Sequence, residues 1–402
     1  MSKLGYQLVA VPPPAENTPP DAAYAVIQAV VTQDMADISR FPIPDLKIGT
    51  LDALVSNAED LARLDTTCEG YVYKVADILK QILQGDRRKM AEQEVVGDRA
   101  AEEYLAGFQW NTSKYRSDRS IAELMQMLAK DAAASEQDVR TKFSEYNAVK
   151  SQLTQFTRRQ TGNLSTRALA DIVRKEHVLV GSDYLVTLFF AIPKNNQKDW
   201  EKAYETLTPM VVPRSSQKIS QDEEFALYNV VVFKKHAQEF AHKARELKFI
   251  PRDFTYDKEE QARSREDLAE AKVKERKLWG DVLRLARAAF GDTFMAWVHL
   301  KALRVYVESV LRYGLPARFC CVLVRPFKKQ DKAVMKALDD KYAYLQPTNL
   351  QKKKQKKEKG DKTRGGQEGL EESVNAVEGS LGLEGEYRPF VVFPINWTPT
   401  EE

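Results

Sequence analysis

The chain is poor in the residues that build metal centres and disulfide frameworks. Its 402 residues include only three cysteines and four histidines. Cys320 and Cys321 are adjacent, and Cys68 lies far from both, so the cysteines lack the spacing of a zinc site or of a disulfide scaffold. This usage favours a protein kept reduced in the cytosol.

Long apolar runs are also lacking. No stretch approaches the roughly 18 uncharged apolar residues that a membrane-spanning helix requires. The apolar run at residues 8–11 is too short for the core of a secretory leader, and three prolines follow it. We therefore expect a cytosolic protein whose contact with a membrane is indirect.

The charge is almost balanced, which argues against nucleic acid as the main partner. The net charge is +3, while charged residues make up 30% of the chain. A protein that binds a polyanion usually concentrates positive charge. Abundant charge of both signs instead indicates long helical faces that water covers.

Apolar spacing predicts several helices in the first part of the chain. The pattern covers about residues 21–38, where Pro42 then breaks it, and continues over residues 45–83. Residues 120–160 contain no proline or glycine, so we predict one long helix there, with its apolar register disturbed near residues 133–136. A short strand is expected over residues 4–11.

Residues 163–256 mix strand and helix patterns and predict a small α+β domain. Residues 184–192 (YLVTLFFAI) and 227–233 (LYNVVVF) have strand character. The other elements expected in this domain are helices over residues 199–207 and 236–247 and an extended piece over residues 249–256.

A second long helix is predicted to begin near residue 257. Residues 258–277 hold seven basic and six acidic side chains. A helix this polar cannot be surrounded by a core. Because the α+β domain lies between two long helices, we expect them to run antiparallel as a neck. Residues 294–311 are apolar nearly all round and predict a buried helix that ends at Gly314.

The last part of the chain combines strand patterns with one biased segment. Strands are expected over residues 319–324 and 387–397, and a helix over residues 334–345. Residues 352–364 hold eight basic side chains, and residues 368–386 hold six glutamates and no basic residue. We predict that residues 351–386 are a disordered charged insertion.

No pattern of catalytic or cofactor-binding residues is recognisable. The chain has no Walker-type phosphate loop, and Gly365-Gly366 lies in the charged insertion without a preceding strand. His177 is isolated, and His236 and His242 stand six apart, which misplaces them for a shared metal. His299 lies in an apolar helix, where a hydrogen-bonded core histidine is the commoner case. We predict no catalytic, cofactor or metal site.

Two features have alternative interpretations. Ser215 and Ser216 follow Arg214 and could be phosphorylated, but a polar turn after Pro213 is favoured. The basic residues within 352–362 could contact acidic lipid headgroups or nucleic acid. A solvated loop neutralised by its own acidic half is favoured there.

Seven segments together resemble the C-subunit of the eukaryotic vacuolar-type proton-pumping ATPase (V-ATPase). They follow the order of that family, span almost the whole chain and end in its most specific run, RVYVESVLRYGLP. The segments are residues 44–55 (PDLKIGTLDALV), 108–115 (FQWNTSKY), 162–173 (GNLSTRALADIV), 182–194 (SDYLVTLFFAIPK), 204–216 (YETLTPMVVPRSS), 244–256 (ARELKFIPRDFTY) and 296–316 (AWVHLKALRVYVESVLRYGLP).

The resemblance implies a mainly α fold with α+β end domains, arranged as an elongated head, neck and foot. The head would be residues 164–256. The neck would be residues 151–163, beginning as early as residue 120, and residues 257–287. The foot would combine residues 1–150 with residues 288–402.

The resemblance also implies a function without catalysis or cofactor. The resemblance implies that the chain acts as a clamp. It would join peripheral stalks, made of the subunits E and G, to the cytosolic part of the membrane a-subunit. Such a protein acts as a stator, supports ATP-driven proton transport and reversible assembly, and lies on the cytosolic face of vacuolar and other endomembranes. Actin is a further candidate partner. The alternative is a coiled-coil tether or actin-binding cytoskeletal adaptor unrelated to the pump, which would need sustained heptads.

Overall fold

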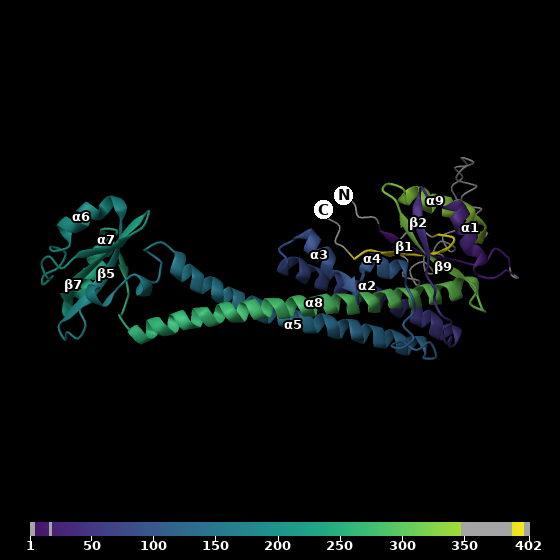
Figure 1. The fold of residues 1–402 in the computed structure, drawn as a ribbon, viewed down its shortest axis with the longest axis horizontal. Coiled ribbons are helices and arrows are strands. Elements are labelled where there is room, and N and C mark those ends of the chain that lie inside the picture. Colours follow the sequence, from purple (N-terminus) through teal and green to yellow (C-terminus); the bar gives the residue numbers. More distant parts are fainter. Residues whose placement is uncertain (1–4, 16–17, 347–387, 398–402) are drawn as a thin grey trace, which may run out of the picture. The chain divides into compact units, whose positions relative to one another are not determined.

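The fold is taken from a computed structural model of the chain, which describes residues 5–15, 18–346 and 388–397 (Figure 1). The chain divides into two compact units, Met1–Phe143 with Asp281–Glu402 (unit 1) and Ser144–Gly280 (unit 2). Each unit combines helices with a small antiparallel sheet. The predicted class, mainly α with α+β domains, is therefore confirmed. The charged insertion predicted at residues 351–386 lies outside the described residues.

Unit 1 is built on a four-stranded sheet that brings the two ends of the chain together. The strand order is β10-β1-β9-β2, and each neighbouring pair is antiparallel. The central strand β1 pairs with β10 on one side and with β9 on the other. The four strands are β1 (Tyr6–Val11), β2 (Ala36–Arg40), β9 (Cys320–Pro326) and β10 (Val391–Ile395).

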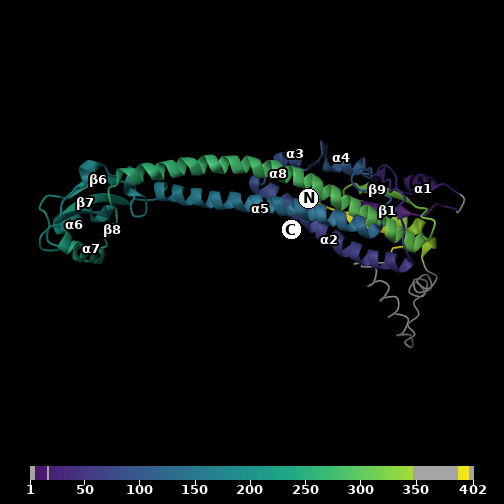
Figure 2. The ribbon, with the colours of Figure 1, turned by 90° about the horizontal axis from the view of Figure 1, so that it is seen from below.

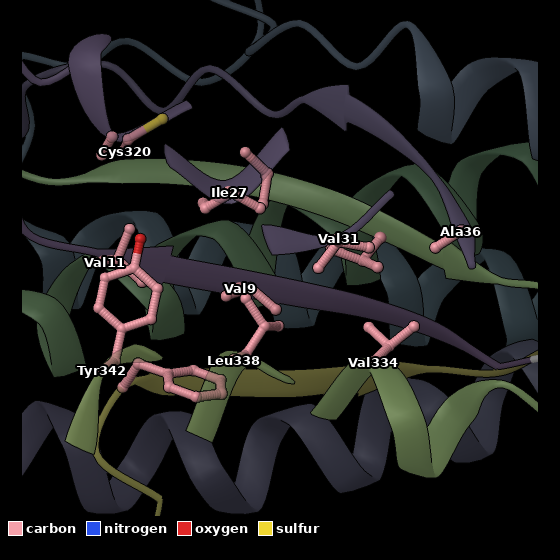
Figure 3. Close-up of a cluster of buried hydrophobic side chains, with 13 residues drawn as sticks. Val9, Val11, Ile27, Val31, Ala36, Cys320, Val334, Leu338 and Tyr342 are labelled. Atoms are coloured by element: carbon pink, nitrogen blue, oxygen red, sulfur yellow. The ribbon is translucent and has the colours of Figure 1, made fainter. Parts of the chain in front are cut away.

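The two faces of this sheet are covered by different helices. The helices α1 (Ala22–Val30) and α9 (Asp331–Lys341) cover one face, where Val9, Ile27 and Leu338 share an apolar core (Figure 3). The other face packs against α8, since the guanidinium of Arg304 lies 4.3 Å from the ring centre of Phe393. The sheet is thus the middle layer of unit 1.

Helices form most of the rest of unit 1, and α5 and α8 continue into unit 2. Within each unit, α5 and α8 lie side by side (Figures 1 and 2). The long helices are α2 (Leu51–Ile82), α5 (Ile121–Thr161) and α8 (Lys258–Tyr313), and the short elements between α2 and α5 are α3 (Arg87–Gln93), β3 (Val95–Val96), β4 (Arg99–Ala100) and α4 (Ala101–Ala106).

Unit 2 contains a second antiparallel sheet with the order β6-β7-β5-β8. One face is covered by α6 (Gln197–Ala203) and α7 (Ala237–Glu246), which bury Trp200 and Phe240. The segment of residues 164–178 covers the other face and packs Leu169 against Phe189. The strands predicted at residues 184–192 and 227–233 are confirmed. The four strands are β5 (Leu185–Pro193), β6 (Gln217–Gln221), β7 (Phe225–Phe233) and β8 (Ile250–Arg252).

Two predicted helix boundaries differ most from the structure, each for a physical reason. The helix expected over residues 21–38 ends at Val30, because residues 36–40 pair with β9 as a strand. The helix expected from residue 45 begins at Leu51, because the Thr50 hydroxyl caps it by accepting a hydrogen bond from the Ala53 amide at 3.3 Å. The helices expected at residues 257–287 and 294–311 are both present, as parts of one continuous helix, α8.

The other predicted helices differ less. The long helix over residues 120–160 is confirmed as α5, without interruption at residues 133–136. The predicted strand at residues 319–324 is confirmed as β9, and the strand at residues 387–397 is reduced to β10. The helix expected over residues 334–345 begins earlier, as α9, and is followed by a short 3-10 turn, Ala343–Leu345.

One buried carboxylate joins α2 to α8. Asp65 is 2% exposed, and its carboxylate lies 2.8 Å from the Lys301 ammonium and 2.6 Å from the Arg304 guanidinium. The indole nitrogen of Trp297 donates a third hydrogen bond to Asp65 at 2.8 Å. Two cations on α8 thus share one anion on α2 in a setting where water cannot replace it.

We predict that Asp65→Asn lowers the free energy of unfolding by about 3–5 kcal/mol, because it removes the counter-charge that touches the buried Lys301 and the largely buried Arg304. Denaturant titration of the full chain measures this loss. Asp60→Asn, an exposed position on the same helix, is the control and should change the free energy by less than about 0.5 kcal/mol. Equal stability of the two variants would contradict this account of the cluster.

Candidate interaction surfaces and polar sites

The histidines outside α8 do not form a shared site. His236 and His242 lie at the start and middle of α7, where each faces its own glutamate. The Nδ1 atom of His236 is 3.4 Å from Glu239, and that of His242 is 3.5 Å from Glu246. His177 lies apart from both, in the segment that covers the unit 2 sheet, where its Nδ1 atom accepts a hydrogen bond from a backbone amide at 3.1 Å.

His299 is a hydrogen-bonded core histidine, as its apolar setting in the sequence predicts. Its Nε2 atom accepts a hydrogen bond from the Asn111 amide at 3.0 Å, and its Nδ1 atom lies 2.8 Å from the Met295 carbonyl oxygen, to which it donates. The rings of Phe108 and Trp110 lie 5.1 and 4.9 Å from the imidazole centre. Burial lowers the pKa of His299 to about 4, so the ring is neutral at physiological pH.

The cysteines are buried and chemically quiet. Burial raises the pKa of the Cys68 thiol to about 12 and that of Cys320 to about 11, and it raises the pKa of Cys321 well above its usual value. The thiolate is the form of cysteine that attacks substrates and binds metals. Thiols that stay protonated in this way act as small apolar side chains that fill the core.

The two serines singled out in the sequence have structural partners. The Ser215 hydroxyl donates to the Val212 carbonyl oxygen at 2.7 Å and accepts from the Val231 amide at 3.1 Å. The Ser216 hydroxyl accepts a hydrogen bond from the indole of Trp200 at 2.9 Å. The polar-turn interpretation is supported, because both hydroxyls fix the chain where it joins the sheet.

Neither a metal site nor a membrane span is found in the part of the chain that the structure describes. Over those residues no three His, Cys, Asp or Glu side chains gather where they could hold an ion. Nor does any helix there combine the length and the apolar character needed to cross a bilayer.

A polar network fastens the connection between α5 and the unit 2 sheet. The amide of Leu164 donates to Asp222 at 2.6 Å, and the side-chain amide of Asn163 donates to Glu224 at 2.9 Å. The guanidinium of Arg252 on β8 donates to the carbonyl oxygens of Ser165 and Arg167. Residues 163–167 are therefore tied both to the β6–β7 turn and to the strand that precedes α8.

Sequence reasoning did not identify Asp222 or Arg252 as important. A signal existed for Arg252, since it and its partners fall in two of the segments that carry the family resemblance, residues 244–256 and 162–173. The pairing itself could not be found, because it joins residues more than 80 positions apart.

Exposed large apolar side chains occur in both units, and those that lie close together mark candidate interaction surfaces. In unit 2, four of them lie near one end of the sheet, at Leu179, Val180, Tyr184 and Met210. In unit 1, the first turns of α2 expose Leu51, which is 68% exposed, and the turn after α8 exposes Leu315, which is 64% exposed.

Because His299 is buried and neutral, we predict that acid destabilises the chain through it. Its pKa is about 4 in the folded chain and near 6.5 when unfolded, so the unfolded chain binds a proton first as the pH falls. The free energy of unfolding should therefore fall by up to about 3 kcal/mol between pH 6.5 and pH 4. Denaturant titrations at several pH values measure this dependence.

The free energy of unfolding should fall less steeply with pH in His299→Gln than in the unmodified chain. In His242→Gln the fall should be unchanged, since the His242 side chain lies on the surface and is 76% exposed. An identical pH dependence in His299→Gln and the unmodified chain would rule out this source of acid sensitivity.

Comparison with known proteins places these features in a family context. The model of the V-ATPase C-subunit family matches residues 6–391. The V-type proton ATPase C 1 subunit of Xenopus laevis is 42% identical over 307 residues, which cover 76% of this chain and 80% of that protein. The Rattus norvegicus protein of the same name is 42% identical over 312 residues, covering 78% of this chain and 82% of that protein.

A more distant match is to a solved structure of the cytoplasmic N-terminal domain of the V-ATPase I-subunit, a homologue of the a-subunit. It is 14% identical, covers 83% of this chain and 97% of that chain, and has a TM-score of 0.27, which is too low to bear on the fold. The family model and the sequence relatives agree with each other and extend over most of the chain. The chain belongs to the family of V-ATPase C-subunits.

Proposed function

We propose that the chain is a non-catalytic stator and regulatory subunit of a V-type proton pump. It clamps peripheral stalks made of the subunits E and G to the cytosolic part of the membrane a-subunit, and so supports ATP-driven proton transport and reversible assembly on the cytosolic face of endomembranes. The observation that carries the proposal is the family match over residues 6–391. Actin remains a further candidate partner.

In this proposal the head and the foot each contact a peripheral stalk, and the foot also contacts the a-subunit. The head is residues 164–256, the foot combines residues 1–150 and 288–402, and the neck is residues 151–163 and 257–287. Separate cores support this division, because Trp200 and Phe240 fill the core beside the unit 2 sheet, while Val9 and Leu338 belong to the core of unit 1. A body with its own core can present a partner surface without help from the other body.

The long helices suit a part that must resist torque. The helix α8 begins in unit 2 and ends in the core of unit 1 without a break. A load on one unit would therefore pass to the other through helical hydrogen bonds. In unit 2, the Tyr146 hydroxyl donates to Glu275 at 3.1 Å and links α5 to α8. In unit 1, the Asp65 cluster anchors the far part of α8.

We expect an affinity-tagged chain, purified from membranes with mild detergent, to bring down the pump subunits E, G and a. Washing under conditions that disassemble the pump should release the a-subunit and leave the chain soluble. A preparation that contains cytoskeletal proteins and no pump component would refute the proposal and favour the tether alternative.

A second prediction tests the stator role through Gly280, the residue of α8 at the boundary of the two units. A side chain at position 280 would meet nothing within 4 Å, so Gly280→Ala should be tolerated and should strengthen the helix. Gly280→Pro should break α8 there, because proline removes a helical hydrogen bond at a cost of about 3 kcal/mol. We expect Gly280→Pro to reduce ATP-driven proton transport by the assembled pump severalfold.

Gly280→Ala is the matched control for Gly280→Pro. Far-ultraviolet circular dichroism and recovery with the pump should show that both variants fold and assemble. Proton transport at the unmodified rate by a pump that contains Gly280→Pro would contradict the idea that α8 carries load.

A further inference from the structure

We infer that the stalk docks on one end of the unit 2 sheet, through a surface of the stalk that combines an apolar stripe with acidic side chains. The docking residues are Leu179, Val180, Tyr184 and Met210, here called the tip surface. The inference rests on the proposed function and adds to it the place of contact and the chemistry of the partner.

Backbone hydrogen bonds bring the tip surface together from three parts of the chain. The amide of Lys234 donates to the carbonyl oxygen of Tyr184 at 2.8 Å, just before β5 begins. The amide of Phe233 donates to the carbonyl oxygen of Met210 at 3.5 Å. Tyr184 and Met210 therefore lie on either side of the end of β7.

The segment with Leu179 and Val180 reaches the same end of the sheet. The Leu179 amide donates to the Thr187 hydroxyl at 3.0 Å, and Thr187 is the third residue of β5. This end is opposite the α5 connection, which bonds to Asp222 and Glu224 in the β6–β7 turn. The tip surface is thus free of the chain's own connection to α5.

The exposure of these side chains is unusual for a unit with a well-filled core. Tyr184 is 76% exposed, Met210 61%, Val180 59% and Leu179 45%, whereas Phe190 and Trp200 in the same unit are fully buried. Adjacent exposed apolar side chains are costly in water and mark sites of association. Tyrosine and methionine are also the residue types enriched at such contacts.

The backbone that presents Met210 supports a role beyond folding. Met210 and Arg214 have positive φ values of 66° and 58°, a region that residues other than glycine rarely adopt. Both lie in the loop before β6, which the Ser215 hydroxyl fastens to β7 by its hydrogen bond with the Val231 amide. Strained backbone that its surroundings hold in place is concentrated at functional sites.

The charge beside the tip surface identifies the partner's chemistry. Lys234 and Lys235 are exposed directly after β7, next to Tyr184, and outnumber the exposed Asp183 that precedes Tyr184. Among the described residues neither lysine forms an ion pair. A complementary partner would place acidic side chains beside an apolar stripe, since opposite charges across an interface guide association and fix its orientation.

The position at strand ends also restricts how the partner binds. The end of β7 is paired on both sides, with β5 and with Val211, so around it the tip surface offers side chains in place of an open strand edge. Contact through side chains suits an apolar stripe on a preformed stalk and does not suit an extended peptide that would add a strand.

The experiment places a photo-crosslinking residue at the tip of the full chain within the assembled pump. Tyr184→benzoylphenylalanine should crosslink to one of the stalk subunits, E or G, on irradiation. Leu247→benzoylphenylalanine is the matched control, because Leu247 is 46% exposed in the same unit but follows α7 at a distance from the tip in the fold, and it should give no stalk crosslink.

Charge reversal then tests the partner's acidic side chains with the same readout. Combined with the Tyr184 crosslinker, Lys234→Glu and Lys235→Glu should reduce the yield of stalk crosslink about fivefold or more. Lys198→Glu and Lys202→Glu, exposed on α6, should leave it within about twofold. An unchanged yield after reversal at the tip would overturn the electrostatic part of the inference.

The outcomes separate this inference from the proposed function. A chain that joins the pump but crosslinks from Tyr184 to nothing, or to a protein other than E and G, would overturn the tip surface while the stator role stands. A chain that is absent from the purified pump would overturn the proposed function and the tip surface with it.

Discussion

The fold of unit 1 depends on the buried carboxylate of Asp65, because it pairs with the buried Lys301 and the largely buried Arg304 of α8. Lys301 and Arg304 project from the most apolar stretch of the chain, and without Asp65 their burial would be strongly unfavourable. The contacts of Asp65 with Trp297, Lys301 and Arg304 favour one register of α8 against α2. Further charges of this stretch are also satisfied inside, since Arg312 lies 2.7 Å from Glu308.

Once α8 is fixed, it positions the strand that closes the sheet. Arg312 donates to the carbonyl oxygen of Phe390, and the Tyr313 hydroxyl accepts from the amide of Val391 at 3.1 Å. The same hydroxyl donates to the carbonyl oxygen of Ala10 on β1 at 2.8 Å. The last turn of α8 therefore bonds to both β1 and β10. The pairing of these two strands is supported by the helix as well as by their own hydrogen bonds.

Sequence patterns predict the elements whose cause is local and miss those whose cause is distant. The helix α5 and the strands β5 and β7 carry complete patterns of their own. Residues 36–38 continue a helical pattern in the sequence. They form a strand only because they pair with β9, which lies far along the chain, so the local pattern could not reveal it. The two stretches predicted at residues 257–287 and 294–311 form one helix, and Gly291 between them allows close packing, since a side chain there would lie 2.9 Å from the Val95 carbonyl oxygen. The tip surface could not be predicted, because its residues look like core until the fold leaves them uncovered.

The two halves of α8 show how one helix can serve two environments. Residues 258–277 carry thirteen charges in twenty positions and can remain helical beside water with only a narrow seam against α5. Residues 294–311 are apolar and are surrounded by the core of unit 1. A loop between the halves would have let each fold separately, but it would also have yielded under load. The uninterrupted helix gives up that independence, which agrees with the stator role proposed above.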